Sequence, residues 1–215
     1  MSIKRYCQKS NNFENFRKIR RMRIAIEING VLRDTLKKIQ EVYEKWYIEN
    51  PYKEEEEKGE IFSDVTSLDI MKHLKFSNED ELYDFLYKEY TMEIFGHAGS
   101  VEYNGMKELN DFYLDMREKH EILIVSDEMG KSKPASLFYL SKFGCLVETI
   151  KFYSESTLNN LWDSTDILLT ANPNLLLNHP DNKKVIKYIT SYNLDIESEL
   201  QISSIKELKE KIENL

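Results

Sequence analysis

The chain has 215 residues, of which 41% are hydrophobic and 32% are charged, and its formal net charge is −8. This composition suits one soluble domain, or one domain with an inserted module, and supplies enough apolar residues for a sizeable core. We expect neither a membrane span nor a secretory signal, because no long apolar run occurs and the N-terminus is basic and polar. Cys7 and Cys145 have no metal-binding or redox spacing, so we expect reduced thiols and a cytoplasmic location.

The chain begins with a concentration of basic residues. Residues 1–23 carry a net charge of +7, which leaves −15 on residues 24–215. This asymmetry is typical of an arm that binds an acidic protein surface or nucleic acid, although a solvated extension is the alternative interpretation. We predict that residues 1–22 form such an arm. Its main expected partners are other protein subunits, with nucleic acid as the competitor, and its interaction residues are Lys4, Arg5, Lys9, Phe13, Phe16, Arg17, Lys18, Arg20 and Arg21.

Beyond the arm, short apolar runs alternate with amphipathic stretches, which is typical of an α/β fold with a mostly parallel sheet. Residues 64–95 have a helical pattern, in which Ser77 is a candidate N-cap, and Ser203 or Ser204 is expected to cap a helix that ends the chain. The predicted strands are 23–28, 121–126, 149–153, 165–170 and 184–190, and the other predicted helices are 35–47, 105–119 and 133–143.

The first predicted strand runs into Gly30-Val31-Leu32-Arg33-Asp34-Thr35. This segment resembles the first motif of the haloacid dehalogenase (HAD) phosphatase superfamily, in which the strand ends in Asp-x-Asp-Gly. In that family the first aspartate is the nucleophile and the second is the general acid/base. Glu27 and Asn29 occupy these two positions here, whereas the structural part of the motif is intact. The resemblance therefore implies the fold and not the chemistry.

The two replacements affect the implied chemistry differently. Glu27 keeps a carboxylate, but its stem is one methylene longer, which displaces the carboxylate oxygen by roughly 1 Å. A misplacement of this size can lower the rate of a catalysed reaction on the order of 100-fold. The amide of Asn29 has no proton to exchange near neutral pH. Asn29-Gly30 also has a purely structural interpretation as a tight turn, since both residues tolerate positive φ.

Two further motifs of the family have counterparts in this chain. The predicted strand 121–126 ends in Ser126, where the family places a hydroxyl that bonds the phosphoryl group, although serine is also common at strand ends for local bonding. The family's lysine corresponds to Lys133, with Lys131 as the second choice. An exposed lysine that merely precedes a helix is the alternative for either position.

The fourth motif is the most altered. The family ends this strand with two acidic residues that hold Mg²⁺, and this sequence has Thr170 and Ala171 there, followed by Asn172-Pro173. Mg²⁺ requires oxygen ligands, preferably carboxylates, in near-octahedral order. One carboxylate, that of Glu27, remains at the four acidic positions, and Asp127 and Glu128 are the nearest additional acids. We therefore expect neither a metal site nor catalytic residues, so Glu27, Asn29, Ser126 and Lys133 count only as altered positions.

These observations predict a three-layer Rossmannoid α/β fold of the HAD type, with a helical cap inserted after strand one. The expected organisation is an arm at 1–22, a core at 23–35 and 105–215, and a cap at 36–104. The placement of the cap resembles that of deoxyribonucleotidase-like phosphatases. The predicted function is an inactive HAD-fold structural or interaction module without a cofactor. The alternative is a Mg²⁺-dependent phosphatase of (deoxy)nucleoside monophosphates.

A weaker resemblance concerns HAD-like proteins of crAss-like bacteriophages, some of which are virion components. It is carried by the stretches 65–69, 93–99 and 125–128, which read Val-Thr-Ser-Leu-Asp, Glu-Ile-Phe-Gly-His-Ala-Gly and Val-Ser-Asp-Glu. This resemblance implies a structural role and the virion as an alternative location.

Overall fold

The fold of the chain comes from a computed structural model, which describes residues 21–49, 68–127 and 130–215. Its centre is a six-stranded sheet in the order β3-β2-β1-β4-β5-β6, in which every neighbouring pair is parallel. The strands are β1 (Arg23–Glu27), β2 (Glu121–Ser126), β3 (Thr149–Phe152), β4 (Ile167–Thr170), β5 (Lys184–Tyr188) and β6 (Gln201–Ile202). The predicted fold class is confirmed.

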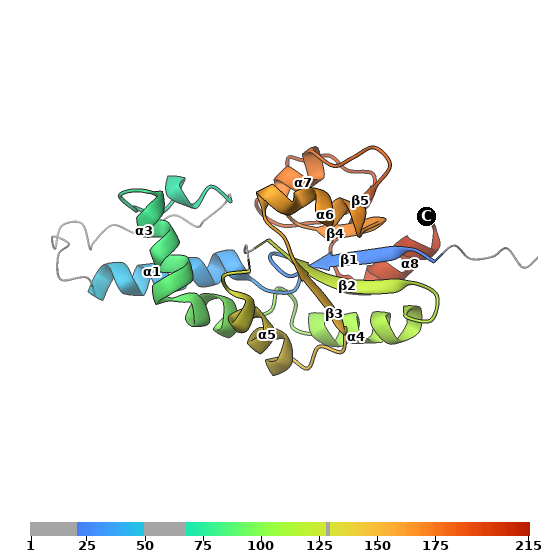
Figure 1. The fold of residues 1–215 in the computed structure, drawn as a ribbon, viewed down its shortest axis with the longest axis horizontal. Helices are drawn as coiled ribbons and strands as arrows, with labels where there is room; N and C mark the ends of the chain where they lie inside the picture. The colour runs from blue at the N-terminus through green and yellow to red at the C-terminus, as the bar shows by residue number, and fades with distance from the viewer. Residues whose placement is uncertain (1–20, 50–67, 128–129) are drawn as a thin grey trace, which may run out of the picture.

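The central strands β1, β2 and β4 form because most of their residues are apolar on both faces, as expected of strands buried between two helical layers. In β1, Ile24, Ala25 and Ile26 are fully buried. Ile24 and Ile26 belong to one apolar cluster with α4 (Gly105–Met116), α5 (Lys133–Lys142) and α8 (Leu208–Glu213). Ala25 belongs to another cluster with α6 (Leu158–Asp163) and α7 (Pro173–Leu177). The sheet is therefore the middle of three layers, and Figure 1 shows α4 and α5 below it and α6 and α7 above it.

The helices that cover the sheet begin and end at recognisable residues. Gly144, at φ 70°, follows α5 in the left-handed conformation that glycine adopts readily. Ser204 accepts a bond from the backbone N–H of Lys206, in a capping box with Glu207, ahead of the last helix. The sheet-covering helices are α4 (Gly105–Met116), α5 (Lys133–Lys142), α6 (Leu158–Asp163), α7 (Pro173–Leu177) and α8 (Leu208–Glu213).

A separate helical region follows strand β1 and lies to one side of the sheet (Figure 1). Its apolar cluster is centred on aromatic side chains such as Tyr43, whose ring lies 4.9 Å from that of Phe76. The region consists of α1 (Thr35–Glu49), a 3₁₀ turn (Ile70–Lys72), α3 (Glu79–Asp84) and two π-helical turns (Phe85–Glu89 and Met92–Gly96). This is the helical cap of the predicted fold class.

Several predicted elements differ in detail from the structure. Asn78, not Ser77, caps α3, because its side chain accepts the backbone N–H of Glu81. The predicted strand 165–170 begins at Ile167, the first residue of this segment that pairs with β1 and β5. The short elements α6, α7 and β6 were not predicted. Among the described residues, no helix has the length and apolarity needed to cross a membrane.

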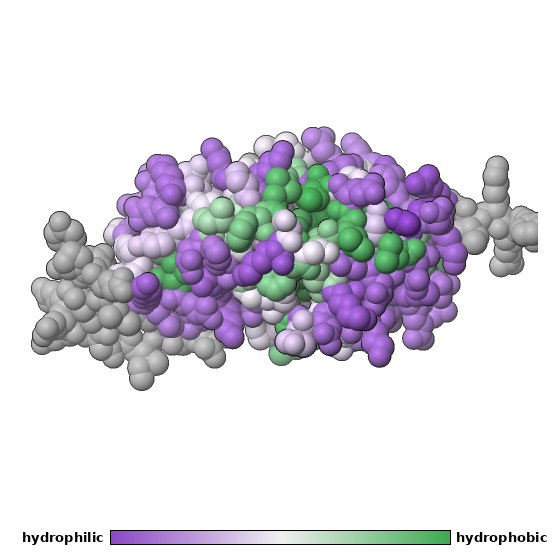
Figure 2. All heavy atoms as spheres, turned by 90° about the horizontal axis from the view of Figure 1, so that it is seen from below, coloured by the Kyte–Doolittle hydropathy of each residue, from purple (hydrophilic) through white to green (hydrophobic). Residues whose placement is uncertain are grey.

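The lower face of the molecule exposes apolar side chains. Figure 2 shows them gathered over the middle of this face, with hydrophilic residues around them. On the helices of this side, Leu114 of α4 and Leu137 and Phe138 of α5 are exposed. Exposed apolar groups that cluster in this way are common at protein interfaces.

Candidate functional site

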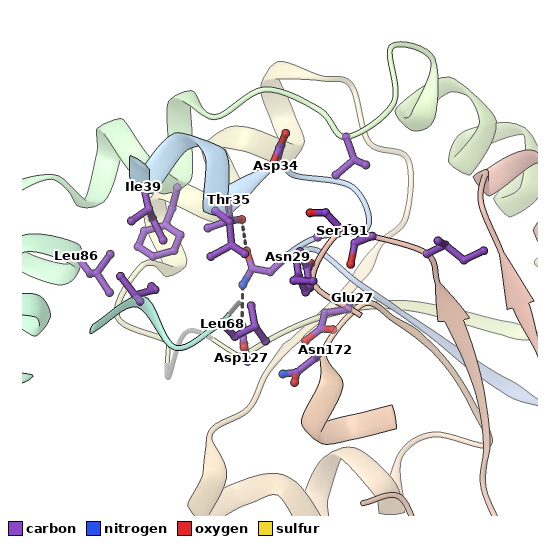
Figure 3. Close-up of a pocket in the computed structure, with 18 of the residues that line it drawn as sticks. Glu27, Asn29, Asp34, Thr35, Ile39, Leu68, Leu86, Asp127, Asn172 and Ser191 are labelled. Atoms are coloured by element: carbon purple, nitrogen blue, oxygen red, sulfur yellow. Dashed lines mark hydrogen bonds between the residues drawn. The ribbon is translucent and has the colours of Figure 1, made fainter. Parts of the chain in front are cut away.

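A cavity of about 380 Å³ lies where the carboxyl ends of β1, β2 and β4 meet the helical cap. The open end of a parallel sheet is where α/β proteins place their ligands. Figure 3 shows Glu27, Asn29 and Asp127 on the sheet side and Ile39 and Leu86 on the cap side. The other described residues that line it are Gly30, Asp34, Thr35, Leu36, Leu68, Ile70, Tyr87, Phe95, Val101, Asn172, Ile189, Thr190, Ser191 and Tyr192.

Glu27 lies at the end of β1, on the floor of this cavity, and is 1% exposed. Tyr153 Oη donates to Glu27 Oε1 at 2.5 Å, and the hydroxyl of Thr170 donates to Glu27 Oε2. Burial, and secondarily the charge of Asp127, raises the pKa of Glu27 to about 8, although the two hydrogen bonds oppose this shift. The carboxyl group is therefore mostly uncharged at neutral pH, and both of its oxygens are engaged.

Asn29 is held by partners on both ends of its amide. Its Nδ2 donates to Asp127 Oδ1 at 2.6 Å, and its Oδ1 accepts from Thr35 Oγ1 at 2.6 Å and from Arg33 Nη2 at 2.7 Å. The bonds to Asp127 and Thr35 are the dashed lines of Figure 3. The side chain is thus fixed in a network and does more than fill a turn.

Arg33 is the largest fully buried side chain of the described residues. Its guanidinium donates to the carbonyl of Phe95 at 2.7 Å, to Ser136 Oγ at 2.9 Å and to Thr35 Oγ1 at 3.1 Å, in addition to Asn29. It also lies 5.1 Å from the ring centroid of Phe95. Burial lowers the pKa of Arg33 to about 9, so the group stays charged at neutral pH. Arg33 therefore joins the sheet, the cap and α5 around one buried cation.

The turn after β1 requires glycine for two reasons. Gly30 has φ 72°, a left-handed conformation that L-residues rarely adopt. A β-carbon there would also lie 1.9 Å from Tyr192 Oη and 3.0 Å from Ala171 Cβ. Tyr192 thus packs directly on the turn, and Ala171 is fully buried beside it.

Ser126 and the two candidate lysines do not line the cavity. Ser126 is fully buried, and its Oγ has no hydrogen-bond partner within the described part of the chain. Lys133 is exposed, with its Nζ 5.9 Å from the ring centroid of Phe152, and Lys131 is exposed with its Nζ at the same distance from that of Tyr83. Ser126 directly follows Val125, the residue that pairs with Glu27 across β1 and β2, whereas the described ring contacts of the two lysines are with Phe152 and Tyr83 and not with the site.

The positions that correspond to the Mg²⁺ ligands of the family do not fit this ion. Glu27 and Asn29 already use their oxygens, and Thr170 Oγ1, besides donating to Glu27, accepts the backbone N–H of Asn172 at 2.9 Å. Ala171 offers no side-chain ligand atom. No group of three His, Cys, Asp or Glu side chains suitable for a metal occurs among residues 21–49, 68–127 and 130–215.

The sequence did not identify three residues of this site. Tyr153 is the last residue of a predicted strand and Tyr192 follows another, so both resemble ordinary core residues, and Arg33 resembles a surface arginine at the start of a helix. Only for Arg33 does the sequence contain an indication of its role. Arg33 directly follows two apolar residues of the motif, and an arginine that is buried there needs hydrogen-bond partners.

The predicted arm lies almost entirely outside the described residues. This applies to Lys4, Arg5, Lys9, Phe13, Phe16, Arg17, Lys18 and Arg20, whereas Arg21 is described and exposed. Arg23 begins β1 and forms an ion pair with Asp166 at 2.9 Å. Its charge therefore belongs to the domain, and +6 remains on residues 1–22.

Comparison with known proteins supports the fold. No family model and no curated protein matched the sequence. A crystal structure of a HAD-superfamily hydrolase, subfamily IA, variant 1, from Geobacter sulfurreducens PCA is similar, with a TM-score of 0.54 and 11% identity, over 91% of this chain and 100% of that chain. A dehalogenase crystal structure has a TM-score of 0.47 and 10% identity, over 88% of this chain and 96% of that chain. The chain therefore has the HAD fold.

Proposed function

We propose that this chain is a non-catalytic HAD-fold protein that serves as a structural or interaction module. The observation that carries this proposal is the state of Glu27 at the nucleophile position. An attacking carboxylate needs a charged oxygen that faces the substrate. Glu27 instead has Tyr153 and Thr170 on its two oxygens, and its raised pKa keeps it mostly protonated at neutral pH.

The other altered positions support the same proposal. An amide at Asn29 cannot exchange a proton with a leaving group, and the amide is fixed by Arg33, Thr35 and Asp127. With Lys133 and Ser126 outside the cavity lining, the groups that would bind a transferring phosphoryl group are also missing from it. Together these features remove nucleophile, acid/base and phosphate ligands from one site.

The kind of module is inferred from its surfaces. A basic segment beside an acidic body favours association with acidic protein surfaces, and the exposed Leu137 and Phe138 on α5 are the type of group that interfaces cover. We infer other protein subunits as the partners, with nucleic acid as the competing partner of residues 1–22. A role in a bacteriophage virion rests on the weaker sequence resemblance alone.

A hydrolysis assay tests the absence of catalysis. The full chain with Mg²⁺ should release no phosphate from deoxynucleoside monophosphates or from p-nitrophenyl phosphate above the rate of a heat-denatured sample. The decisive comparison is Glu27→Ala, which should leave this background unchanged. Phosphate release that is lost in Glu27→Ala and kept in Glu148→Gln, a change at an exposed residue, would establish the alternative phosphatase function instead.

A further inference from the structure

The cavity at the carboxyl ends of β1, β2 and β4 has one apolar wall. Leu36 and Ile39 of α1, Leu86 of the first π-helical turn and Phe95 of the second line its cap side. The ring of Tyr87, another lining residue, stacks on Phe95 at 5.6 Å with an interplanar angle of 8°. A volume of about 380 Å³ with such a wall falls in the range of about 300–1,000 Å³ that is typical of small-molecule sites.

The opposite wall is polar and contains acidic groups. Asp127 lies past the end of β2, half-buried, and one of its oxygens accepts from Asn29 Nδ2. Asp34, at the start of α1, also lines the cavity. No lysine, arginine or histidine occurs among the described lining residues. Arg33 bonds the lining residues Asn29 and Thr35, but it is fully enclosed and directs its N–H groups at protein atoms.

This combination disfavours a phosphate ester as the occupant. A phosphate carries close to two negative charges near neutral pH, and in this cavity it would face carboxylates without a lining cation. A positively charged ligand is favoured instead, because it is attracted by the carboxylate of Asp127 and can make cation–π interactions with aromatic rings such as that of Tyr87.

We propose that the cavity binds an organic ammonium ion that carries an apolar tail. The ammonium group would lie at Asp127 on the sheet side, and the tail would lie along Leu36, Ile39 and Leu86 on the cap side. This inference goes beyond the proposed function and is independent of it, since binding requires neither Glu27 as a nucleophile nor a metal ion.

Calorimetric titration of the full chain with matched six-carbon probes tests the proposal. Hexylammonium should bind at low-millimolar concentration or below, hexanol should bind more weakly, and hexyl phosphate should not bind. Methylammonium should bind at least about tenfold more weakly than hexylammonium, because each buried methylene is worth roughly a fourfold gain in affinity. Equal affinity for hexyl phosphate and hexylammonium, equal affinity for the two amines, or no binding of hexylammonium would each overturn the proposal.

Variants at Asp127 locate the charge. Asp127→Asn keeps an acceptor for Asn29 and should weaken hexylammonium binding about tenfold, with hexanol binding unchanged. Asp127→Glu retains the carboxylate and should restore most of the affinity, which distinguishes a charge effect from damage to the fold. Asp181→Asn is the matched control, because it makes the same change at an exposed residue that precedes the amino end of β5, whereas the cavity lies at the carboxyl ends of the strands. It should leave hexylammonium binding unchanged. Unchanged hexylammonium binding in Asp127→Asn would refute the assignment of the ammonium group.

Discussion

Replacing Glu27 with glutamine should remove a strong pH dependence from the stability of the protein. The carboxyl group of Glu27 has its ordinary pKa near 4.5 in the unfolded chain, and burial raises its pKa to about 8 in the folded one. Between these values the folded state retains a proton that the unfolded state has released. The free energy of unfolding therefore falls as the pH rises, by about 1.4 kcal/mol per pH unit for one group.

The size of the effect follows from that interval. The contribution of Glu27 is complete below pH 4.5 and is lost as the pH rises through about 8. From pH 5 to pH 8 the loss amounts to about 4 kcal/mol, a large part of the 5–15 kcal/mol that is typical of a whole domain. Glutamine at this position has no proton to release, so the variant should lack this component.

Urea unfolding at fixed ionic strength between pH 5 and 8.5 measures the effect. The useful quantity is the difference in free energy of unfolding between the wild type and Glu27→Gln, because contributions from other groups, such as Asp34 and His120, cancel in it. Glu148→Gln, at an exposed residue, is the matched control and should follow the wild type at every pH. A difference that stays constant to within about 0.5 kcal/mol across this range would refute the reasoning.

Two further predictions concern Arg33 and the arm. Arg33→Met should lower the free energy of unfolding by about 3 kcal/mol, because it removes the hydrogen bonds that the buried guanidinium donates to Phe95 O, Ser136 Oγ and Asn29 Oδ1. Arg117→Met at an exposed site should change it by less than about 0.5 kcal/mol. Equal losses in the two variants would contradict this account. Deletion of residues 1–20 should leave the melting temperature nearly unchanged, since it retains the Met22 carbonyl that accepts from Glu121, and should abolish self-association in sedimentation experiments. Undiminished assembly of the truncated chain would exclude the arm as the contact, and a loss of nucleic-acid binding instead would identify the competing partner.

The sequence predicted the sheet well because its strands are buried on both faces. Runs such as 121–126 and 167–170 are apolar enough to be recognised without knowledge of their neighbours. Short elements such as α6 and α7 have too few residues to display a helical period, and the sequence alone did not separate them from loops. The choice of Ser77 over Asn78 failed for a related reason, since adjacent residues of similar capping preference are distinguished only by backbone geometry.

The sequence predicted where Glu27 and Asn29 lie, but not which side chains they contact. Glu27 and Asn29 were placed correctly at the end of β1, because the motif fixes them relative to Gly30. Their partners come from distant parts of the chain: Tyr153 follows Glu27 by 126 residues and Thr170 by 143. Side-chain contacts at that separation depend on strand order and register, which a single sequence does not specify.

The replacements at the four acidic positions form one consistent arrangement and are not independent losses. Four carboxylates at the strand ends would repel one another and require a bound cation. Here the buried guanidinium of Arg33 supplies a permanent positive charge, and Asn29 connects it to Asp127. Thr170 provides a hydroxyl for Glu27, and Ala171 leaves room beside the Gly30 turn on which Tyr192 packs. The site is therefore held together by hydrogen bonds among its own side chains. Restoring a single acid at Asn29 or Thr170 would disrupt these bonds without creating a complete set of metal ligands.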